Sequence, residues 1–517
     1  MLISWGLASL PILLLVGLMI GRRWGAARAG PAGWLAAAVT ALLAFGARLD
    51  LLAVAQAKAF YQALDVLLIV TAAYLLYRVV DEAGGVEALA AALPGVTADR
   101  GMQALLIAWV FASFLQGVGG FGVPVVVTAP ILASLGFGPL VSVVAPSIGH
   151  AWSVTFGSLG SSFQALMATT GLPGEVMAGP AAAVLGLIGL GCGAWVAWLA
   201  DGKRGLRRLA LPVLVIGTSM SAVQYLLAVH RLWNLAGFGA GMAGLAVGLV
   251  MARRRRGLMG GPPTVPIRSR ELALALAGYA ALIVITFALV LVRPVGEALG
   301  GVVLQARFPE TVTSLGYRTP AEAGKAIVLL RHAGAALTYS AAVAYLLYAA
   351  AGRLRPGAAG RILVSTGRGV LSSWVGIASM VSMVSIMTHA GMTDVLARGL
   401  AAGAGPAFPL VAPWIGALGA FISGSNTSSN LLFGLLQRRT AELLGLTAAW
   451  VLAGQTAGGA IGSVVSPAKV VVGAASLRGD GPPPEEAMVL RRLLIPAGIL
   501  VAVVSLIALA LWIGGWA

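Results

Sequence analysis

Hydrophobic and polar positions along this chain alternate in long blocks. Apolar runs recur from Ile3–Ile20 to about Leu494–Trp512, and short polar connections separate them. A membrane-spanning helix needs about 20 mostly apolar residues, so the pattern predicts about 12 membrane-spanning helices. Ile3–Ile20 is preceded by no charged side chain and followed by no obvious cleavage site, so we interpret it as a retained first helix.

Two stretches interrupt the apolar pattern. Gln116–Pro130 reads QGVGGFGVPVVVTAP, and its glycines and prolines do not suit a regular helix interior. Phe421–Gly434 reads FISGSNTSSNLLFG, and its centre, Gly424–Asn430, has no apolar side chain. Backbone freed from a helix cannot face lipid. We therefore expect two broken or re-entrant elements that line a wet cavity, although a polar contact between helices is a second interpretation.

The two broken elements fall in different halves of the chain. Residues 1–200 contain the first, near 116–130, and residues 271–517 contain the second, near 421–434. Paired broken helices are typical of transporters built from inverted repeats with a central site. We expect an all-α polytopic membrane protein in which residues 1–517 form a single transmembrane transporter domain, and we expect the two elements to meet near the bilayer centre.

Composition agrees with a membrane protein. The 517 residues are 59% hydrophobic and 10% charged, with a mean hydropathy of +0.94, whereas soluble proteins have about 25% charged residues. The net charge of +17 comes from short basic connections such as Lys203–Arg208 and Arg253–Arg270, which the positive-inside rule places in the cytoplasm. It therefore does not predict nucleic-acid binding. Arg293–Lys325 mixes both signs, and we place it outside.

Several kinds of chemistry find no support in the sequence. The single cysteine, Cys192, excludes an internal disulfide, and four scattered histidines give no metal-ligand spacing. No GxxxxGK[ST] motif is present, which argues against ATP as the driving force. We expect no metal, no other cofactor and no catalytic residue.

The candidate binding residues come from both broken elements. Glycine lets backbone approach a ligand, half-helix amides favour anions, and hydroxyl and amide side chains supply hydrogen bonds. We expect a small organic anion to be bound by Gly117, Gly119, Gly120, Gly122, Ser425, Asn426, Thr427, Ser428, Ser429, Asn430 and Lys469.

Two ionisable residues allow two interpretations each. Lys469 either binds the substrate anion or extends toward the cytoplasmic surface near Arg478. Asp65 lies within the first turns of a helix expected at about 61–76, where it is either a functional carboxylate or an interfacial one.

Four motifs together resemble the L-lactate permease family. They are QGVGGFGVPVVVTAP at Gln116–Pro130, HAGMTDVL at His389–Leu396, GALGAFISGSNTSSNLLFGLLQ at Gly416–Gln437, and TAGGAIGSVVSP at Thr456–Pro467. Their order and spacing are similar to that family across nearly the whole chain. The resemblance implies a multi-pass transporter of the cell inner membrane that carries lactate or a related 2-hydroxymonocarboxylate, such as glycolate, by proton symport.

The chain departs from the family at positions that bear on coupling. Gln116 and Asn426 stand where the family commonly has Glu and Asp, His150 where it commonly has Asn, and Ser463 where it often has Lys. An amide cannot carry a proton. His150 or His389 is then the candidate coupling residue. Sodium-coupled or uncoupled transport of another small anion remains an alternative, because neutral oxygens accept hard cations.

Two other classes of protein are alternatives to a transporter. An intramembrane serine hydrolase would need a pair such as Ser425 and His389 within hydrogen-bond reach, together with an oxyanion hole. Nothing in the sequence fixes that geometry. A channel is the other class, and saturable uptake with counterflow would argue against it.

Overall fold

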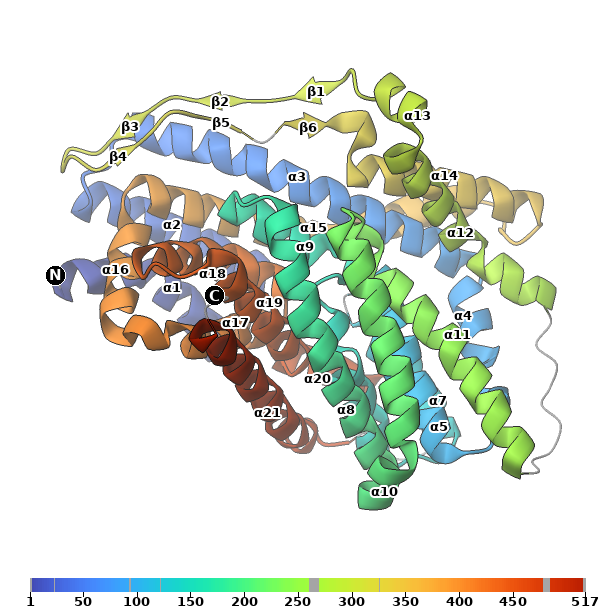
Figure 1. Cartoon of the computed structure of the whole chain (residues 1–517). Helices are drawn as coiled ribbons and strands as arrows, with labels where there is room; N and C mark the ends of the chain where they lie inside the picture. The colour runs from blue at the N-terminus through green and yellow to red at the C-terminus, as the bar shows by residue number, and fades with distance from the viewer. Residues whose placement is uncertain are drawn as a thin grey trace.

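The computed structural model describes residues 2–22, 24–92, 94–120, 122–259, 269–324, 326–477 and 484–514. Phe121, Arg268, Lys325 and Arg478, which belong to motifs or connections considered above, lie outside these ranges. The described chain is almost entirely helical, which confirms the predicted all-α polytopic class (Figure 1). Nine of its helices are long and apolar enough to cross a membrane, or up to eleven if each of two bent pairs forms one span, close to the expected 12.

Helices from the two ends of the chain pack into one group. α15 packs against both α2 and α3, and α1 packs against both α2 and α16. The bounds are α1 (Leu2–Gly21), α2 (Ala26–Ala44), α3 (Leu49–Glu82), α15 (Ala358–His389) and α16 (Met392–Ala404). α3 begins twelve residues before the helix expected at about 61–76, so Asp65 lies well inside it. Lys58 had suggested a loop before this helix, but its side chain pairs with Glu322 of a hairpin that covers α3.

A second group of helices is interrupted at its centre. Its members are α5 (Arg100–Ala104), a π-helical segment (Leu105–Phe111), α6 (Ala112–Val118), α7 (Val123–Ser134), α8 (Pro139–Gly149), α9 (Gly157–Thr170), α17 (Phe408–Ser423), α18 (Asn426–Leu443), α19 (Ala448–Val464) and α20 (Pro467–Ala475). Longer or peripheral helices surround it, namely α4 (Gly85–Ala92), α10 (Gly174–Val229), α11 (Trp233–Met259), α12 (Ser269–Leu291), α13 (Arg293–Ala298), α14 (Ala333–Ala350) and α21 (Glu486–Ile513).

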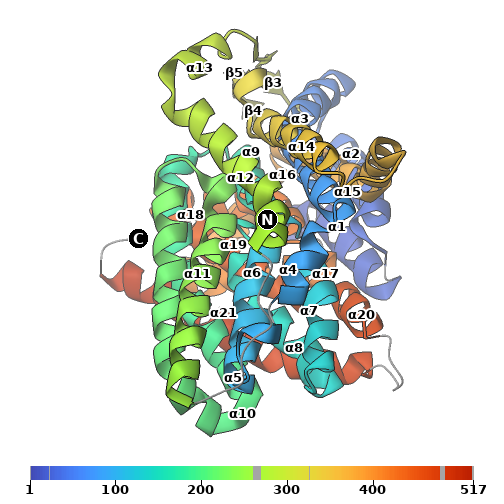
Figure 2. The same ribbon diagram turned by 90° about the vertical axis from the view of Figure 1, so that its right-hand side faces the viewer.

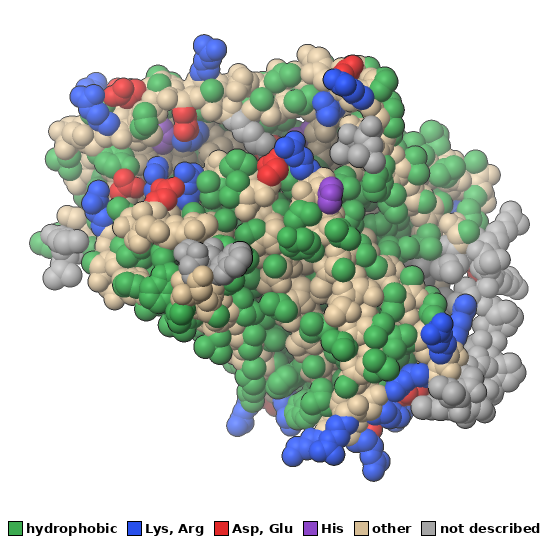
Figure 3. Space-filling model, in the orientation of Figure 1, with side chains coloured by type: hydrophobic (Ala, Val, Ile, Leu, Met, Phe, Trp, Pro, Cys, Tyr) green, Lys and Arg blue, Asp and Glu red, His purple; other side chains and the backbone are tan. Residues whose placement is uncertain are grey.

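The molecule has two chemically different ends. At one end, which we call the basic end, Arg208 and Arg255 both pair with Asp99, and α10 bends sharply at Asp201–Gly202. Figure 3 shows Lys and Arg side chains gathered there, whereas both signs of charge are mixed at the opposite end. The positive-inside rule assigns the basic end to the cytoplasm.

The opposite end carries a long hairpin, and we call it the hairpin end (Figures 1 and 2). Six short strands pair antiparallel as β1 with β6, β2 with β5 and β3 with β4. The bounds are β1 (Val303–Leu304), β2 (Arg307–Phe308), β3 (Thr311–Val312), β4 (Arg318–Thr319), β5 (Glu322–Ala323) and β6 (Ile327–Val328). α3 holds the hairpin through a hydrogen bond from the Tyr61 hydroxyl to the Leu304 carbonyl (2.8 Å) and through a Lys58–Glu322 ion pair.

Small residues allow the interrupted helices to pack closely against their neighbours. α6 and α11 contact each other backbone to backbone at Gly241, where an added Cβ would lie 2.5 Å from the Phe114 Cα. The Phe114 ring then packs against Phe238 and Tyr279. In a bilayer, where lipid is as apolar as the side chains, such close van der Waals contact is a main source of helix association. It holds the segment before the first break in place.

Replacing Gly241 with valine should therefore destabilise the protein. The new side chain would overlap the backbone of α6, and overpacking of this kind costs about 1–3 kcal/mol. Thermal unfolding in detergent should show a lower midpoint for Gly241→Val. Gly498→Val is the matched control, because an added Cβ at Gly498 has no heavy atom within 4 Å. Equal midpoints for the two variants would contradict this account of α6–α11 packing.

Candidate functional site

Four helices of the central group are broken. The breaks lie between α6 and α7 at Gly119–Gly122, between α8 and α9 at His150–Phe156, between α17 and α18 at Gly424–Ser425, and between α19 and α20 at Val465–Ser466. α8 and α9 meet at an angle of 50°, and α19 and α20 at 40°. The two breaks expected from the sequence are present. The other two were not predicted from the sequence. The fourth break follows α19, which runs through Gly458 and Gly459 and ends at Val464 before Ser466-Pro467.

The first and third breaks are the tips of two helical hairpins that open toward opposite ends. Arg100, at the start of α5, donates to the carbonyl of Gly136, just after α7 (2.7 Å), so this hairpin opens toward the basic end. Phe408, at the start of α17, packs with Ala441 near the end of α18. Arg438 on α18 donates to the Thr170 carbonyl at the hairpin end of the molecule, so this second helical hairpin opens toward that end. Opposed hairpins are what inverted repeats would produce.

The tips of the two hairpins approach the same unwound segment. A Cβ at Gly120, which has a positive φ of 60°, would overlap the Ser158 hydroxyl in the α8–α9 region. The side-chain amide of Asn426 donates to the Thr155 hydroxyl a few residues earlier (3.1 Å). An added Cβ at Gly424 would lie 3.4 Å from the Ser466 hydroxyl at the fourth break. The structure thus brings the two predicted elements together through a third one.

A buried network of amides and hydroxyls occupies this meeting point. The Thr456 hydroxyl on α19 accepts from the amides of Asn430 (2.9 Å) and Asn426 (3.3 Å). It also lies 3.1 Å from the Thr155 hydroxyl. Thr427 completes the network, because its hydroxyl lies 2.9 Å from that of Ser162. The amide and hydroxyl side chains predicted at 424–430 therefore find their hydrogen-bond partners mainly in the α8–α9 region and in α19.

Some polar atoms at the meeting point have no protein partner. Within the described ranges, the amide oxygens of Gln116, Asn426 and Asn430 are buried without a hydrogen bond. Each is an acceptor, so each would suit the hydroxyl of a ligand or a weakly held cation. Buried polar groups are normally hydrogen-bonded, and exceptions call for an explanation. A ligand is one explanation.

Lys469 supplies a positive charge beside this network. Its ammonium donates to the hydroxyl of Ser463 (3.3 Å), a fully buried residue at the end of α19. Ser463 lies one helical turn after Gly459, where an added Cβ would overlap the Asn426 side chain. The lysine side chain therefore runs back toward the breaks. Among the residues that the structure describes, no carboxylate pairs with it, so its charge is available to an anion.

Several predicted residues have a structural reason for their identity. Gly117 packs against the α11 backbone, where an added Cβ would lie 2.6 Å from the Phe238 nitrogen, and Gly119 faces the Tyr77 ring. Ser425 is the N-cap of α18 and accepts from the Ser428 amide (3.2 Å). Ser429 donates to the carbonyl of Gly416 and accepts from Gln455. A cap and interhelical hydrogen bonds account for these serines without a ligand.

The two candidate coupling histidines lie in different places. His150 is buried at the α8–α9 break, and its Nδ1 bonds the Pro146 carbonyl (2.5 Å). His389 ends α15, and its Nδ1 bonds the Thr311 hydroxyl of β3 (2.8 Å). His389 thus connects the end of α15 to the β-hairpin. Among the hydrogen bonds of the described residues, none joins it to Ser425, which leaves the hydrolase alternative without its required pair.

A cavity of about 660 Å³ lies above the network at the hairpin end. Its lining includes Asp65 of α3, Thr169 of α9, Leu435 of α18 and Glu322 of the hairpin. The Thr169 hydroxyl donates to the carbonyl of Leu431 (3.3 Å), the residue that follows Asn430 on α18. The cavity therefore reaches within about two helical turns of the network.

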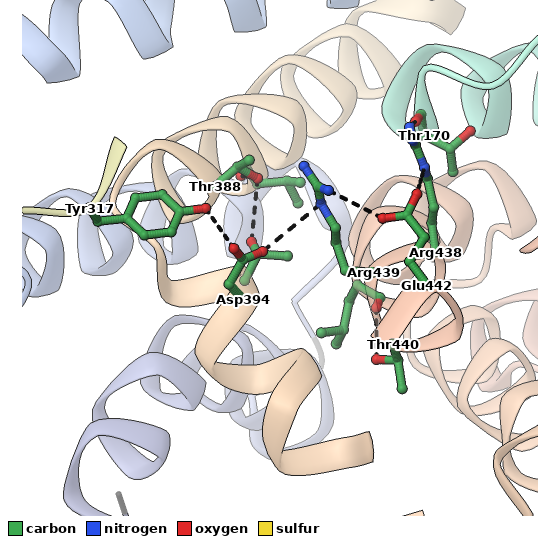
Figure 4. Close-up of polar contacts among 11 residues, drawn as sticks. Thr170, Tyr317, Thr388, Asp394, Arg438, Arg439, Thr440 and Glu442 are labelled. Atoms are coloured by element: carbon green, nitrogen blue, oxygen red, sulfur yellow. Dashed lines mark hydrogen bonds and ion pairs between the residues drawn. The ribbon is translucent and has the colours of Figure 1, made fainter. Parts of the chain in front are cut away.

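Beside this cavity, a charge cluster joins the hairpin to α16 and α18 (Figure 4). The Tyr317 hydroxyl donates to Asp394 of α16 (2.8 Å), and burial and this hydrogen bond raise the pKa of Tyr317 above its usual value. Arg439 of α18 lies between Asp394 and Glu442, at 3.9 Å and 3.2 Å. Arg438 also pairs with Glu442 (2.7 Å).

Sequence interpretation missed the α9 and α19 side of the site. Thr155 and Ser162 complete the network, and the run TFGSLGSS at Thr155–Ser162 could have indicated them by its small and polar residues. Ser158 and Leu159 adopt left-handed backbone conformations, which only tertiary contacts can impose on residues other than glycine. Thr456 gave no signal beyond its place in a motif.

Comparison with known proteins gives a consistent result. The family model described as L-lactate permease matches residues 4–259 and 271–513. The glycolate permease GlcA of Escherichia coli K12 is 26% identical over 470 residues, covering 84% of this chain and 83% of that protein. The L-lactate permease of Bacillus subtilis 168 is 27% identical over 456 residues, covering 81% and 80%.

A search of solved structures found the YdaH transporter of Alcanivorax borkumensis. It aligns with a TM-score of 0.48 and 14% sequence identity, covering 87% of this chain and 85% of that one.

The network predicts a specific role for Thr456. Thr456→Val removes the hydroxyl shared by Asn426 and Asn430 at nearly constant volume, which leaves buried donors unsatisfied at a cost of about 1–3 kcal/mol. We expect a lower unfolding midpoint and weaker substrate binding, measured by thermal unfolding and calorimetry. Thr456→Ser keeps the hydroxyl and should bind like the unchanged protein. Unchanged binding in the valine variant would show that the network does not shape the site.

Proposed function

Since this chain belongs to the L-lactate permease family, we propose that it carries lactate or a related short 2-hydroxymonocarboxylate, such as glycolate, by proton-coupled secondary transport. Its multi-pass helical fold and its similarity to bacterial L-lactate and glycolate permeases support a carrier in the cell membrane. The substrate and the coupling ion within this class are the parts that we propose.

The observation that carries the proposal is Lys469 beside the unpaired amide oxygens. A 2-hydroxymonocarboxylate has an anionic group that accepts hydrogen bonds and a hydroxyl that can donate one. The ammonium of Lys469 can bind the substrate carboxylate, and the amide oxygen of Asn426 or Asn430 can accept a hydrogen bond from the substrate hydroxyl. Backbone amides near Gly120 and Gly122 can add further donors, because neither position has a side chain of its own.

The same unpaired oxygens favour a second candidate. The amide oxygens of Asn426 and Asn430, with the hydroxyls of Thr155 and Thr456, are neutral ligands of the kind that Na⁺ accepts. In that case sodium would drive uptake, and the substrate would bind closer to Lys469. Uncoupled transport is the remaining alternative.

An uptake screen in proteoliposomes tests these proposals. Lactate, glycolate, pyruvate and short dicarboxylates are supplied with pH and sodium gradients set independently. We expect saturable, counterflow-capable uptake of the 2-hydroxymonocarboxylates, with accumulation driven by the pH gradient. Lys469→Gln should weaken their binding about 10- to 100-fold, since a hydrogen bond to a charged group contributes about 1.5–3 kcal/mol.

Lys203→Gln is the matched control, because Lys203 is exposed at the bend of α10. It should leave affinity unchanged. Uptake restricted to other anions would refute the substrate class, and accumulation that needs a sodium gradient would refute proton coupling. Full affinity in Lys469→Gln would remove Lys469 from the site.

His150 gives a prediction about coupling. It lies at the α8–α9 break with its Nε2 buried and without a hydrogen bond among the described residues. If His150 carries the proton, His150→Gln should abolish proton-driven accumulation while substrate exchange at fixed pH survives, because glutamine hydrogen-bonds but does not titrate. Radiolabelled exchange and accumulation assays on the same vesicles check this. Persistent accumulation would exclude His150 as the carrier.

A further inference from the structure

Asp65 is a buried carboxylate in α3 that the central network does not use. Its side chain is 5% exposed, and it lies about one helical turn from Tyr61, through which α3 contacts the hairpin. The residue is covered by protein, so its side chain does not lie at an exposed interface. Burying a carboxylate is costly, so such a residue within a membrane-spanning helix is a functional candidate.

His332 fixes the chemistry of this carboxylate. It is the N-cap of α14, and its Nδ1 accepts a hydrogen bond from the Gly334 amide (3.2 Å). The ring hydrogen is therefore on Nε2, which donates to Asp65 (2.8 Å). Protonating His332 at Nδ1 would remove the cap of α14. The carboxylate of Asp65 is thus the member of the pair that can accept a proton without breaking a helix end.

The pair is reached from the hairpin end. Asp65 lines the 660 Å³ cavity together with Thr169 and Leu435, which lie along α9 and α18 toward the central network. By contrast, neither His150 nor His389 lines this cavity. Of the three titratable candidates, Asp65 has both a cavity beside it and a carboxyl group of the kind that this chain lacks at positions 116 and 426.

The other charged side chains that face the cavity are in ion pairs with opposite charges. From α3 and the hairpin, Lys58 pairs with Glu322. From α10, Glu175 pairs with Arg231 (2.9 Å). From α18, Arg438 and Arg439 both pair with Glu442. α15 contributes only uncharged residues, and Tyr61 is the remaining titratable group. Asp65 adds a negative charge to this lining, so its protonation state affects an anion that enters the cavity.

We propose that Asp65, held by His332, is the site that binds the co-transported proton from the outer side. A proton from water adds to a carboxylate oxygen of Asp65, and Nε2 of His332 keeps its own hydrogen. The cavity then loses one negative charge, which favours the passage of a monocarboxylate anion toward Lys469. This assignment rests on the proposed transport of 2-hydroxymonocarboxylates and names its coupling residue.

The test compares accumulation with exchange in proteoliposomes of the full-length protein. Asp65→Asn imitates a permanently neutral Asp65. We expect it to lose lactate or glycolate accumulation under a pH gradient, while exchange at fixed pH continues and no longer depends on pH. Asp50→Asn makes the same change on the same helix, at an exposed residue paired with Arg48. It should behave as the unchanged protein.

A second variant covers the case in which Asp65→Asn does not fold. Asparagine is a good N-cap, so His332→Asn preserves the start of α14, but its shorter side chain removes the hydrogen bond to Asp65. That bond stabilises the ionised carboxylate. Its loss should move the pH midpoint of transport upward by about one unit.

The outcomes separate this inference from the proposed function. Accumulation in Asp65→Asn equal to that of the unchanged protein, or an unshifted midpoint in His332→Asn, would overturn the assignment while leaving the transport proposal intact. Absence of 2-hydroxymonocarboxylate uptake by the unchanged protein would overturn the function itself. Accumulation driven only by a sodium gradient would overturn proton coupling, and with it the role of Asp65.

Discussion

The structure depends on one constraint, which is that backbone polar groups inside a bilayer must find partners within the protein. Four helices of the central group are interrupted, which frees backbone polar groups locally, and the four breaks lie close together. Each unwound segment is tolerated because the others surround it with hydroxyls and amides, as where Asn426 bonds Thr155 and Thr456. A lone break would be costly. Together the breaks form a polar region between apolar helices, and that region is where a small polar solute can be held.

Much of the fold could be read from the sequence because spans and loops follow the thickness and charge asymmetry of a membrane. The breaks at Gly119–Gly122 and Gly424–Ser425 were visible through their glycines and polar runs. The breaks near His150 and Ser466 were not, because tertiary contacts stabilise them. The left-handed backbone of Ser158 is an example. The partners of Asn426 and Asn430 also could not be predicted, since they come from helices far away in sequence.

The departures from the family pattern acquire a physical meaning in this arrangement. Asn426 donates through its amide to two hydroxyls, which an ionised aspartate could not do. Gln116 packs beside Gly157 in the same region. Neither Asn426 nor Gln116 carries a charge, so the acids that the family resemblance led us to expect at these two positions are absent. Lys469 then faces no fixed acid there among the described residues, whereas Asp65 lines the cavity farther toward the hairpin end. The division of the chain into two halves, 1–200 and 271–517, stays a prediction.

The hairpin acts mechanically as a strap. Its contacts fall on three different helices: Glu322 on α3, Thr311 on the end of α15 and Tyr317 on α16. Three attachments along one stiff ribbon mean that the outer ends of these helices cannot separate unless the strap lets go. If the carrier rocks between two states, the strap therefore keeps the outer ends of α3, α15 and α16 together. The ion pair of Arg439 with Asp394 joins α18 to α16, so this pair would have to break if α18 moved away from the strapped helices.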